Sequence, residues 1–439
     1  MKNRALLLMI FASLALVCAC AQAEETLTWE DCVREAAKNN PALISSKESV
    51  KSTEAAKSIT ASGLFPQVSA SAGVTKSKTE TSGSSGGDGN NGGGGSSNDS
   101  SVNNYNYGVS GNQLIFDGFK TANQVNAASE DIKAAQENYK FTSSDVRLSL
   151  RTAFIELLKA QEGLRIKEEI YERRRQNFEL VTLRYESGQE NKGSLLTEQA
   201  NLIQARFDVT QAGRDIDLSR RKLSKEMGRS DTSEITAKGD FKVAEEVREM
   251  PDFSVIAQDN PSLKQLIAQK NSAIFNLKSA RAEFMPEVTA SGSAGRSDTN
   301  WPPENNNWSI GASVSLPIFE GGKRLADVKK ATAQLNKAEA DLTDGLNSVV
   351  ETLQDRWTSL QQALDNVSVQ KEFLTANEER AKITEAQYSI GFVSFNDWII
   401  IENNLVDAKN SYLEAQANAL VAEANWIQAK GETIENVEK

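Results

Sequence analysis

The chain contains no histidine at all. Without imidazole there is no Ser-His-Asp or Cys-His catalytic arrangement, no histidine general base and no histidine metal ligand. Cysteine is scarce as well: of the three, only Cys32 lies after position 20, so no disulfide framework can form within the folded body. These absences argue against an enzyme, and we predict no catalytic residue, no metal and no cofactor.

Positive charge is also in deficit, since 49 Lys and Arg face 60 Asp and Glu. Nucleic acid binding depends on clustered basic residues, so we predict no nucleic acid partner. After the N-terminal segment, no stretch approaches the roughly 18 consecutive apolar residues that a membrane-spanning helix needs. Because backbone polar groups cannot stay unpaired in hydrocarbon, such a chain could enter a membrane only as a closed sheet.

The N-terminus has the layout of a secretory signal peptide. Lys2 and Arg4 precede an apolar run over residues 5–17, which small residues follow. The signal ends either at Ala23, after a small-x-small site, or at Ala19, before a lipobox cysteine. In the first case residues 1–23 are removed. In the second, Cys20 becomes a lipidated N-terminus. Both alternatives stay open, and both predict export from the cytoplasm.

The rest of the chain consists of one unit that occurs twice. In each copy two prolines lie 25 residues apart, and three glycines follow at intervals of 70 and 40 residues. These positions are Pro41, Pro66, Gly118, Gly188 and Gly228 in the first copy, and Pro261, Pro286, Gly321, Gly391 and Gly431 in the second. The first copy carries an additional polar low-complexity loop, Gly83–Ser101. We predict repeats at 24–230 and 259–431, a linking segment at 231–258 and a polar tail at 432–439.

Each repeat begins with a helix and continues with a β-hairpin, predicted at 66–117 and 286–319. Apolar and small polar residues alternate there with period two. Apolar positions include Val68, Ala70, Ala72, Val74, Tyr105, Tyr107, Val109, Trp308, Ile310, Ala312 and Val314, and the opposite face is mostly Ser and Gly. Small polar side chains suit a wet lumen, and the aromatic residues near the hairpin tips suit the aromatic girdle of an outer membrane barrel.

A very long helix follows each hairpin. In the first copy it is predicted from about Lys120 to Tyr185, with apolar residues at alternating spacings of three and four. Sustained heptads predict a left-handed coiled coil, and some 65 residues make a rod of about 100 Å. Glycines at 188 and 391 end these rods, and helices then return over 195–227 and 395–430. The predicted product is a helical hairpin with an exposed tip in each copy.

Two hairpins supply four strands, whereas the smallest transmembrane barrels have about eight. The barrel must therefore be shared between chains, and three copies would provide twelve strands. The predicted fold class is mainly α with a transmembrane β-barrel, in which each chain of a homotrimer contributes four strands.

Several motifs together make the chain resemble the TolC family of outer membrane efflux proteins over nearly its full mature length. They are Leu27-Thr28-Trp29-Glu30-Asp31-Cys32-Val33, Asn39-Asn40-Pro41-Ala42-Leu43, the strand starts Phe65-Pro66 and Met285-Pro286, Phe116-Asp117-Gly118, Phe319-Glu320-Gly321-Gly322, and the Tyr-x-x-Gly tips. The resemblance implies a homotrimer with a twelve-stranded barrel in outer membrane lipid, a periplasmic α-helical tunnel of antiparallel coiled coils, and a mixed equatorial belt.

The resemblance also implies a passive exit duct of a tripartite efflux pump or type I secretion system. Its partners would be a periplasmic adaptor protein and an inner membrane transporter of the RND, MFS or ABC type, which supplies the energy. The transporter chooses the cargo, so the sequence names no substrate. The alternative is a periplasmic coiled-coil spacer anchored at the outer membrane without a pore, and a surface hydrolase using Asp and Glu is a more distant one.

Site residues are carried over from the family one by one. The tips that engage the adaptor contain Tyr185 and Gly188 in the first copy, and Tyr388 and Gly391 in the second. Tyr388 matches the gate tyrosine, and Asp397 matches the first aspartate that rings the entrance, although its simpler interpretation is a solvated aspartate at a helix start. Three other gate positions carry Val393, Ile400 and Ser194, which predicts a gate without most of its hydrogen-bonded and ionic latch.

Overall fold

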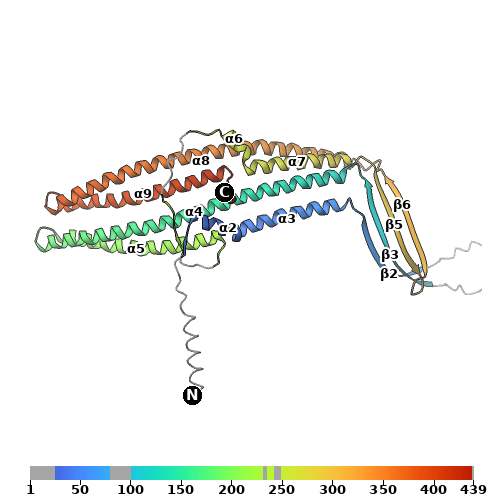
Figure 1. The fold of residues 1–439 in the computed structure, drawn as a ribbon, viewed down its shortest axis with the longest axis horizontal. Helices are drawn as coiled ribbons and strands as arrows, with labels where there is room; N and C mark the ends of the chain where they lie inside the picture. The colour runs from blue at the N-terminus through green and yellow to red at the C-terminus, as the bar shows by residue number, and fades with distance from the viewer. Residues whose placement is uncertain (1–24, 80–99, 231–234, 242–248, 438–439) are drawn as a thin grey trace, which may run out of the picture. The chain divides into compact units, whose positions relative to one another are not determined.

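The computed structural model describes residues 25–79, 100–230, 235–241 and 249–437 (Figure 1). The predicted signal peptide, Cys20 and most of the Gly83–Ser101 loop lie outside these residues. Parts of the linking segment 231–258 and of the tail 432–439 do so as well. Within the described residues, no helix combines the length and hydropathy that a transmembrane helix requires.

Helices make up most of the described chain. They are α2 (Trp29–Asn39), α3 (Pro41–Ser62), α4 (Lys120–Glu186), α5 (Lys192–Met227), α6 (Phe253–Asp259), α7 (Pro261–Ala282), α8 (Lys323–Ser389), α9 (Phe395–Ala429) and the 3-10 helix η1 (Ile434–Asn436). The strands are β1 (Glu25–Leu27), β2 (Gln67–Thr79), β3 (Ser100–Phe116), β4 (Ile235–Ala237), β5 (Glu287–Asp298) and β6 (Asn305–Ser315). The two long helices predicted after the hairpins are present as α4 and α8, each of 67 residues.

The chain forms two compact units, and both draw on both sequence repeats. The first, the helical unit, comprises Met1–Val50, Ala135–Gln265 and Thr343–Lys439, and the second, the sheet unit, comprises Lys51–Ala134 and Leu266–Leu342. The division into two repeats stays a prediction from the sequence.

The sheet unit contains a four-stranded antiparallel sheet in the order β2-β3-β5-β6 (Figure 1). Its register brings the predicted apolar positions onto one face. One row across the sheet reads Ala70, Val109, Ala294 and Trp308, whereas the adjacent row reads Ser69, Ser110, Ser293 and Ser309. Since directly paired residues of antiparallel strands share a face, the period-two alternation of each hairpin becomes an apolar face and a small polar face of the whole sheet.

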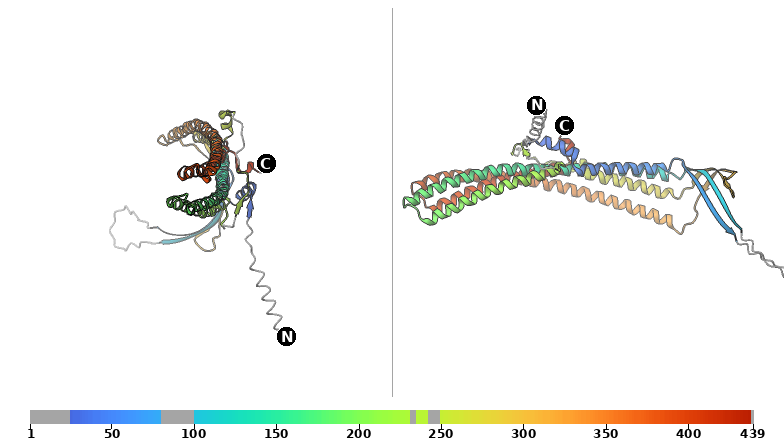
Figure 2. Two further views of the ribbon diagram at one scale, coloured as in Figure 1. Left: turned by 90° about the vertical axis from the view of Figure 1, so that its left-hand side faces the viewer. Right: turned by 90° about the horizontal axis from the view of Figure 1, so that it is seen from below.

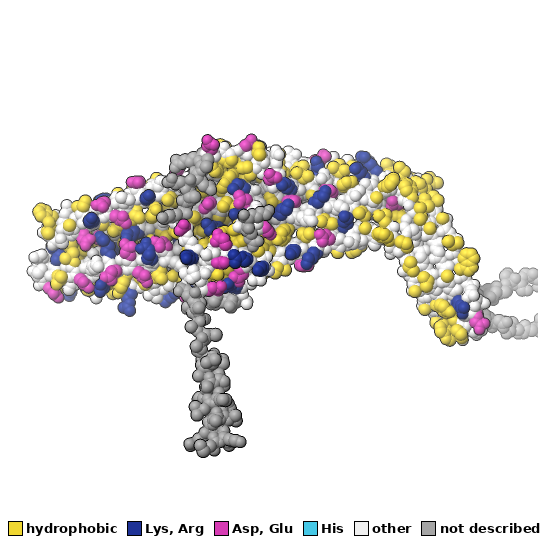
Figure 3. All heavy atoms as spheres, in the orientation of Figure 1, with side chains coloured by type: hydrophobic (Ala, Val, Ile, Leu, Met, Phe, Trp, Pro, Cys, Tyr) yellow, Lys and Arg dark blue, Asp and Glu magenta, His cyan; other side chains and the backbone are white. Residues whose placement is uncertain are grey.

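Cross-strand hydrogen bonds join the side chains of the small polar face. Serine hydroxyls pair at 2.9 Å between Ser69 and Ser110, and again at 2.9 Å between Ser293 and Ser309. The apolar face is exposed to a high degree: Trp308 is 77% exposed and Ile310 82%. On the side seen in Figure 3, mainly hydrophobic and uncharged side chains cover the sheet. An exposed apolar sheet face of this kind indicates an interaction surface.

The helical unit contains two helical hairpins that run side by side (Figures 1 and 2). One consists of α4 and α5, the other of α8 and α9. The turn after α4 has Gly188 at φ 77°, and the turn after α8 has Gly391 at φ 84°. In both, the residue after glycine donates its N–H across the turn, from Gln189 to the Arg184 carbonyl at 2.8 Å and from Phe392 to the Gln387 carbonyl at 2.9 Å. Both tips are Schellman turns, for which glycine is the favoured residue.

An asparagine-proline pair separates two consecutive helices ahead of each β-hairpin. Asn40 separates α2 from α3, and Asn260 separates α6 from α7, because the residue before proline avoids helical backbone angles. Each asparagine amide donates to the end of a return helix, Asn40 to the Glu226 carbonyl at 2.8 Å and Asn260 to the Ala429 carbonyl at 3.0 Å. The single helix predicted at the start of the first repeat is therefore two helices, whereas in the second repeat, predicted from 259, α7 is the one helix ahead of the hairpin.

A two-stranded parallel sheet of β1 and β4 lies against the helical unit, and the sequence pattern did not reveal it. Gln161 on α4 binds the edge of this sheet. The Gln161 side chain donates to the Ala237 carbonyl at 3.2 Å and accepts from the Ala237 N–H at 3.0 Å. Strands of three residues are too short to show a hydrophobic period. The core below them includes Cys32, Leu150 and Phe154.

Candidate functional site: the tips of the helical hairpins

Tyr388 is at the centre of the contacts between the two tips. It lies near the end of α8 and is only 1% exposed. Its ring stacks on Trp398 of α9, with centroids 4.2 Å apart and planes 10° from parallel, and meets the edge of Phe395 at 6.2 Å. The Tyr388 hydroxyl donates to Glu190 Oε2 of the first tip at 3.0 Å. The tyrosine thus links the second hairpin to the first through a hydrogen bond to a carboxylate.

Arg184 joins the tips a second time, from the first hairpin to the second. Its Nη1 donates to the Tyr388 carbonyl at 2.9 Å and to the Ser389 carbonyl at 3.2 Å. Its guanidinium carbon lies 4.7 Å from the centroid of the Tyr388 ring. The positive charge therefore caps the C-terminal end of α8, where free carbonyls favour a cation, and also faces the aromatic ring.

The protonation states suit this arrangement. Burial raises the pKa of the Tyr388 hydroxyl, and the hydrogen bond to Glu190 raises it further, so the phenol stays a neutral donor. Burial pushes the pKa of Glu190 upward, but hydrogen bonds from the Asn191 backbone, Ser194 and Tyr388 outweigh it, so that the pKa is below its usual value. Glu190 is accordingly an ionised acceptor near neutral pH.

Tyr388 therefore has a carboxylate partner from the first tip within one chain, while the gate and its latch stay a prediction. The acidic partner from the first tip is Glu190 and not the residue at position 194. Ser194 lies in the first turn of α5, where its N–H donates to the Asn191 side chain at 3.0 Å in the helix cap. Glu190 comes two residues after the tip glycine, so a search for any acidic residue beside Gly188 would have found it.

Asp397 occupies the start of α9 and is exposed. Its Oδ2 accepts a hydrogen bond from the Ser394 hydroxyl at 2.7 Å, and its N–H donates to Ser394 Oγ at 3.2 Å. Within one chain, these hydrogen bonds correspond to the simpler interpretation of Asp397 as an aspartate at the start of a helix. Val393 is half-buried and Ile400 is 57% exposed, and neither replaces the missing ionic groups.

Around the tips lie apolar side chains that the chain itself does not cover. Tyr185 is 38% exposed, Phe392 82% and Ile390 69%. A β-carbon at Gly188 would meet no other atom within 4 Å, and one at Gly391 would approach only Arg184, at 3.9 Å. Of the four predicted docking residues, Tyr185, Gly188 and Gly391 are thus accessible, whereas the Tyr388 ring is not.

A layer of charges around the buried Glu402, which the sequence did not reveal, connects the two hairpins between α4, α8 and α9. Arg173 of α4 donates to both carboxylate oxygens of Glu402 on α9, at 2.6 and 2.7 Å, and to Glu385 on α8 at 3.2 Å. The Glu402 side chain is 1% exposed and also accepts from Asn177 at 3.2 Å. Such a bidentate pair fixes both the distance and the register of the facing helices.

The neighbouring Arg174 extends the charge layer to α5. It donates to Asn403 at 2.6 Å and lies 3.6 Å from Glu198, whose side chain is fully buried. Burial raises the pKa of Glu198, although Asn201 and Arg174 oppose this shift. Arg173 and Arg174 thus connect the four helices within about one helical turn.

The sequence profile of the outer membrane efflux protein family matches residues 32–229 and 253–432. The chain belongs to this family. It is 22% identical over 364 residues to outer membrane efflux protein BepC of Brucella suis, covering 81% of this chain and 74% of that protein. It is 25% identical over 229 residues to alkaline protease secretion protein AprF of Pseudomonas aeruginosa, covering 50% of this chain and 47% of that protein.

Solved structures agree on the fold. The outer membrane protein VceC of Vibrio cholerae superposes with a TM-score of 0.77 at 19% identity, over 92% of this chain and 96% of that one. The relatives and structural neighbours are outer membrane proteins and channels, so the predicted family and outer membrane location are confirmed. The general role of this chain is that of a channel component in efflux or secretion. Its family and its fold are those of channels rather than enzymes.

Proposed function

We propose that this chain is the passive exit duct of a tripartite efflux pump or type I secretion system. The observation that carries the proposal is the open sheet of the sheet unit. Its apolar face is exposed, and the edge strands β2 and β6 each pair with one neighbouring strand only, so that among the described residues their outer edges are unpaired. Exposed strand edges invite pairing with another chain, and an uncovered apolar face suits lipid.

Pairing β6 of one copy with β2 of the next satisfies both edges and generates a closed ring. Three copies give twelve strands, which are enough for a transmembrane barrel, whereas the four strands of a single chain cannot close one. The small polar face, with its Ser69–Ser110 and Ser293–Ser309 pairs, would line the lumen, and the face with Trp308 and Ile310 would meet outer membrane lipid. The proposed assembly is a homotrimer.

The test is conductance. The purified protein is reconstituted in planar bilayers, and its mass in detergent is measured in parallel. We expect discrete, cation-selective steps from a trimer. A monomeric protein that leaves the bilayer silent would contradict the duct and favour the periplasmic spacer without a pore.

The proposed partners are a periplasmic adaptor at the exposed tips and an inner membrane transporter of the RND, MFS or ABC type. BepC is named for efflux and AprF for protease secretion, so the family serves both kinds of export. Tyr185, Gly188 and Gly391 would belong to the docking surface together with the exposed Ile390 and Phe392.

Asp397 is proposed to form a cation-sensitive constriction in the trimer, where three carboxylates would converge in a narrow entrance. We expect Asp397→Ala to weaken single-channel block by trivalent cations on the order of tenfold or more, because the converging charge is lost. The control is Asp407→Ala, at an exposed acidic position further along α9. Unchanged block in Asp397→Ala would leave the residue with its helix-start role alone.

Tyr388 is proposed to hold the gate closed through Glu190. Tyr388→Phe keeps the ring on Trp398 but loses the hydroxyl that donates to Glu190 at 3.0 Å. A hydrogen bond to a charged group contributes about 1.5–3 kcal/mol, so we expect the open state to gain on the order of tenfold in population. Single-channel recording measures this, and Tyr185→Phe at the first tip is the matched control. Equal open probabilities in the two variants would count against the latch.

A further inference from the structure

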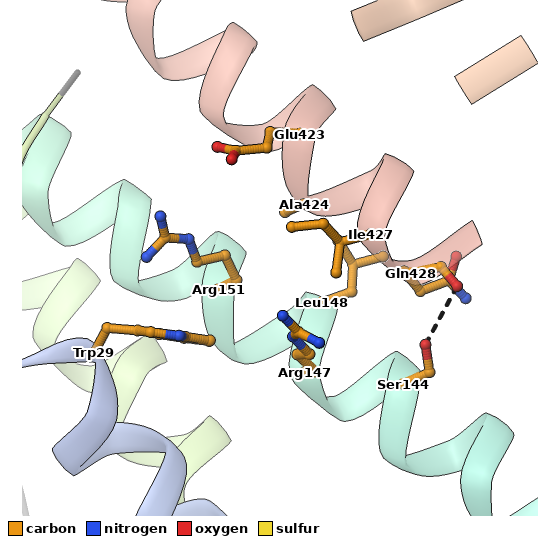
Figure 4. Close-up of a pocket in the computed structure, with 9 residues that line it drawn as sticks. All are labelled: Trp29, Ser144, Arg147, Leu148, Arg151, Glu423, Ala424, Ile427 and Gln428. Carbon is orange, nitrogen blue, oxygen red and sulfur yellow. Dashed lines mark hydrogen bonds between the residues drawn. The ribbon is translucent and has the colours of Figure 1, made fainter. Parts of the chain in front are cut away.

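A small cavity of about 120 Å³ lies in the helical unit between α2, α4 and α9 (Figure 4). It shares no residue with the tip contacts or the charge layer. Its lining residues are Trp29, Ser144, Arg147, Leu148, Arg151, Glu423, Ala424, Ile427 and Gln428. The charged residues of the lining are two arginines and one glutamate, and one of the arginines, Arg147, is paired with Glu432.

Arg151 is the unusual member of this lining. Within the residues that the structure describes, its guanidinium makes no hydrogen bond and no ion pair, and its near neighbour is the Trp29 ring, whose centroid lies 5.0 Å from the guanidinium carbon. Figure 4 shows the guanidinium between Trp29 and the carboxylate of Glu423. A guanidinium has five N–H donors, so this side chain offers the cavity an unused set of donors.

Arg147 stands one helical turn before Arg151 on α4 and adds a second cation to the lining. It already has partners at one nitrogen: Nη1 donates to Glu432 Oε2 at 3.0 Å and to the Thr433 carbonyl at 3.2 Å. Burial lowers the pKa of Arg151; the charges of Glu423 and Glu30 oppose this shift, and the charge of Arg147 adds to it. A half-buried cation beside a second cation is stabilised by a bound anion.

We propose that this cavity binds a small oxoanion, a carboxylate or a phosphate, through the guanidinium of Arg151 with support from Arg147. The planar fork of arginine matches the paired oxygens of both groups. The volume of about 120 Å³ leaves room for one such group. Glu423 repels the anion and keeps its affinity low. No step of the proposed duct requires this site.

The test is isothermal titration of the purified full-length protein in detergent, with inorganic phosphate and with acetate at constant ionic strength. We expect saturable binding of at least one of the two anions. Arg151→Gln should weaken it on the order of tenfold or more, because a charge-assisted bidentate contact is lost. The control is Arg165→Gln, which removes an exposed arginine of the same helix that pairs with Glu162.

Glu423→Gln provides an independent readout with the opposite sign. It removes the repulsion and should tighten anion binding several-fold, which no general loss of folding would produce. Binding of phosphate alone or of acetate alone identifies the chemistry that the site takes. Absence of saturable binding by either anion overturns the proposal. Equal anion affinity in the wild type and in folded Arg151→Gln also overturns it. If Arg151→Gln does not fold, an anion affinity of Glu423→Gln that equals that of the wild type overturns it.

Discussion

Export is expected to stop when Gly188 or Gly391 is replaced by valine, while the oligomer stays intact. Both glycines have positive φ, 77° and 84°, which costs an L-residue roughly 1–2 kcal/mol and a β-branched residue more. The tip turn must therefore change shape. Because no atom lies within 4 Å of a β-carbon at Gly188, the effect there arises from backbone strain at an exposed docking surface and not from a clash in the core.

The measurement compares export by the native system in host cells that carry each variant, with the oligomer followed by mass in detergent. Gly213→Val is the matched control, because this glycine lies within α5, has no positive φ and also has open space around it. Full export by both tip variants would contradict docking at the tips. Loss of export together with the oligomer would instead assign the glycines to folding.

Removal of Arg173 from the charge layer is expected to loosen the tips of both hairpins. Arg173→Met leaves Glu402, 1% exposed, with Asn177 as its remaining partner among the described residues. An uncompensated buried charge costs about 3–5 kcal/mol. Local opening of α9 should therefore become on the order of a hundredfold more frequent, which hydrogen–deuterium exchange of this helix in detergent would detect.

The double variant Arg173→Met with Glu402→Leu tests whether the loss of protection comes from the unpaired Glu402 charge or from the change of side chain at position 173. Replacing both charges by apolar side chains removes the desolvation cost as well as the attraction, so most of the protection in α9 should return. Arg175→Met is the matched single control, since this arginine is half exposed and its one ion pair within the described part of the chain is with Glu172, one turn earlier. If Arg173→Met exchanges as slowly as Arg175→Met, the charge layer does not hold the hairpins together.

At the tips, the sequence predicts the turns but not the contacts between them. Gly188 and Gly391 were predicted as helix-ending glycines, and both Schellman turns have them at positive φ. A Schellman turn is local, because its hydrogen bonds join residues within six positions of one another. Glu190 was missed, since its partner Tyr388 lies 198 residues away and only the packing of the two hairpins brings them together.

The amino-acid sequence by itself determined the features that repeat over short distances. These are the alternating faces of the two β-hairpins, the heptads of α4 and α8, and the glycines of the tips. Each arises from a backbone geometry with a fixed period or a fixed dihedral requirement, which local residue choice is enough to specify.

Only the tertiary structure decided which distant groups meet. The charge layer joins Arg173 to Glu402, and the strand β1 pairs with β4 across about 210 residues of chain. Arg151 lies over Trp29 with no hydrogen bond to any residue that the structure describes. On a long helix, charged residues are common at every turn, and nothing local marks the few that become buried. Burial depends on the helix that packs opposite, and it is burial that turns an ordinary surface charge into a structural link or a binding group.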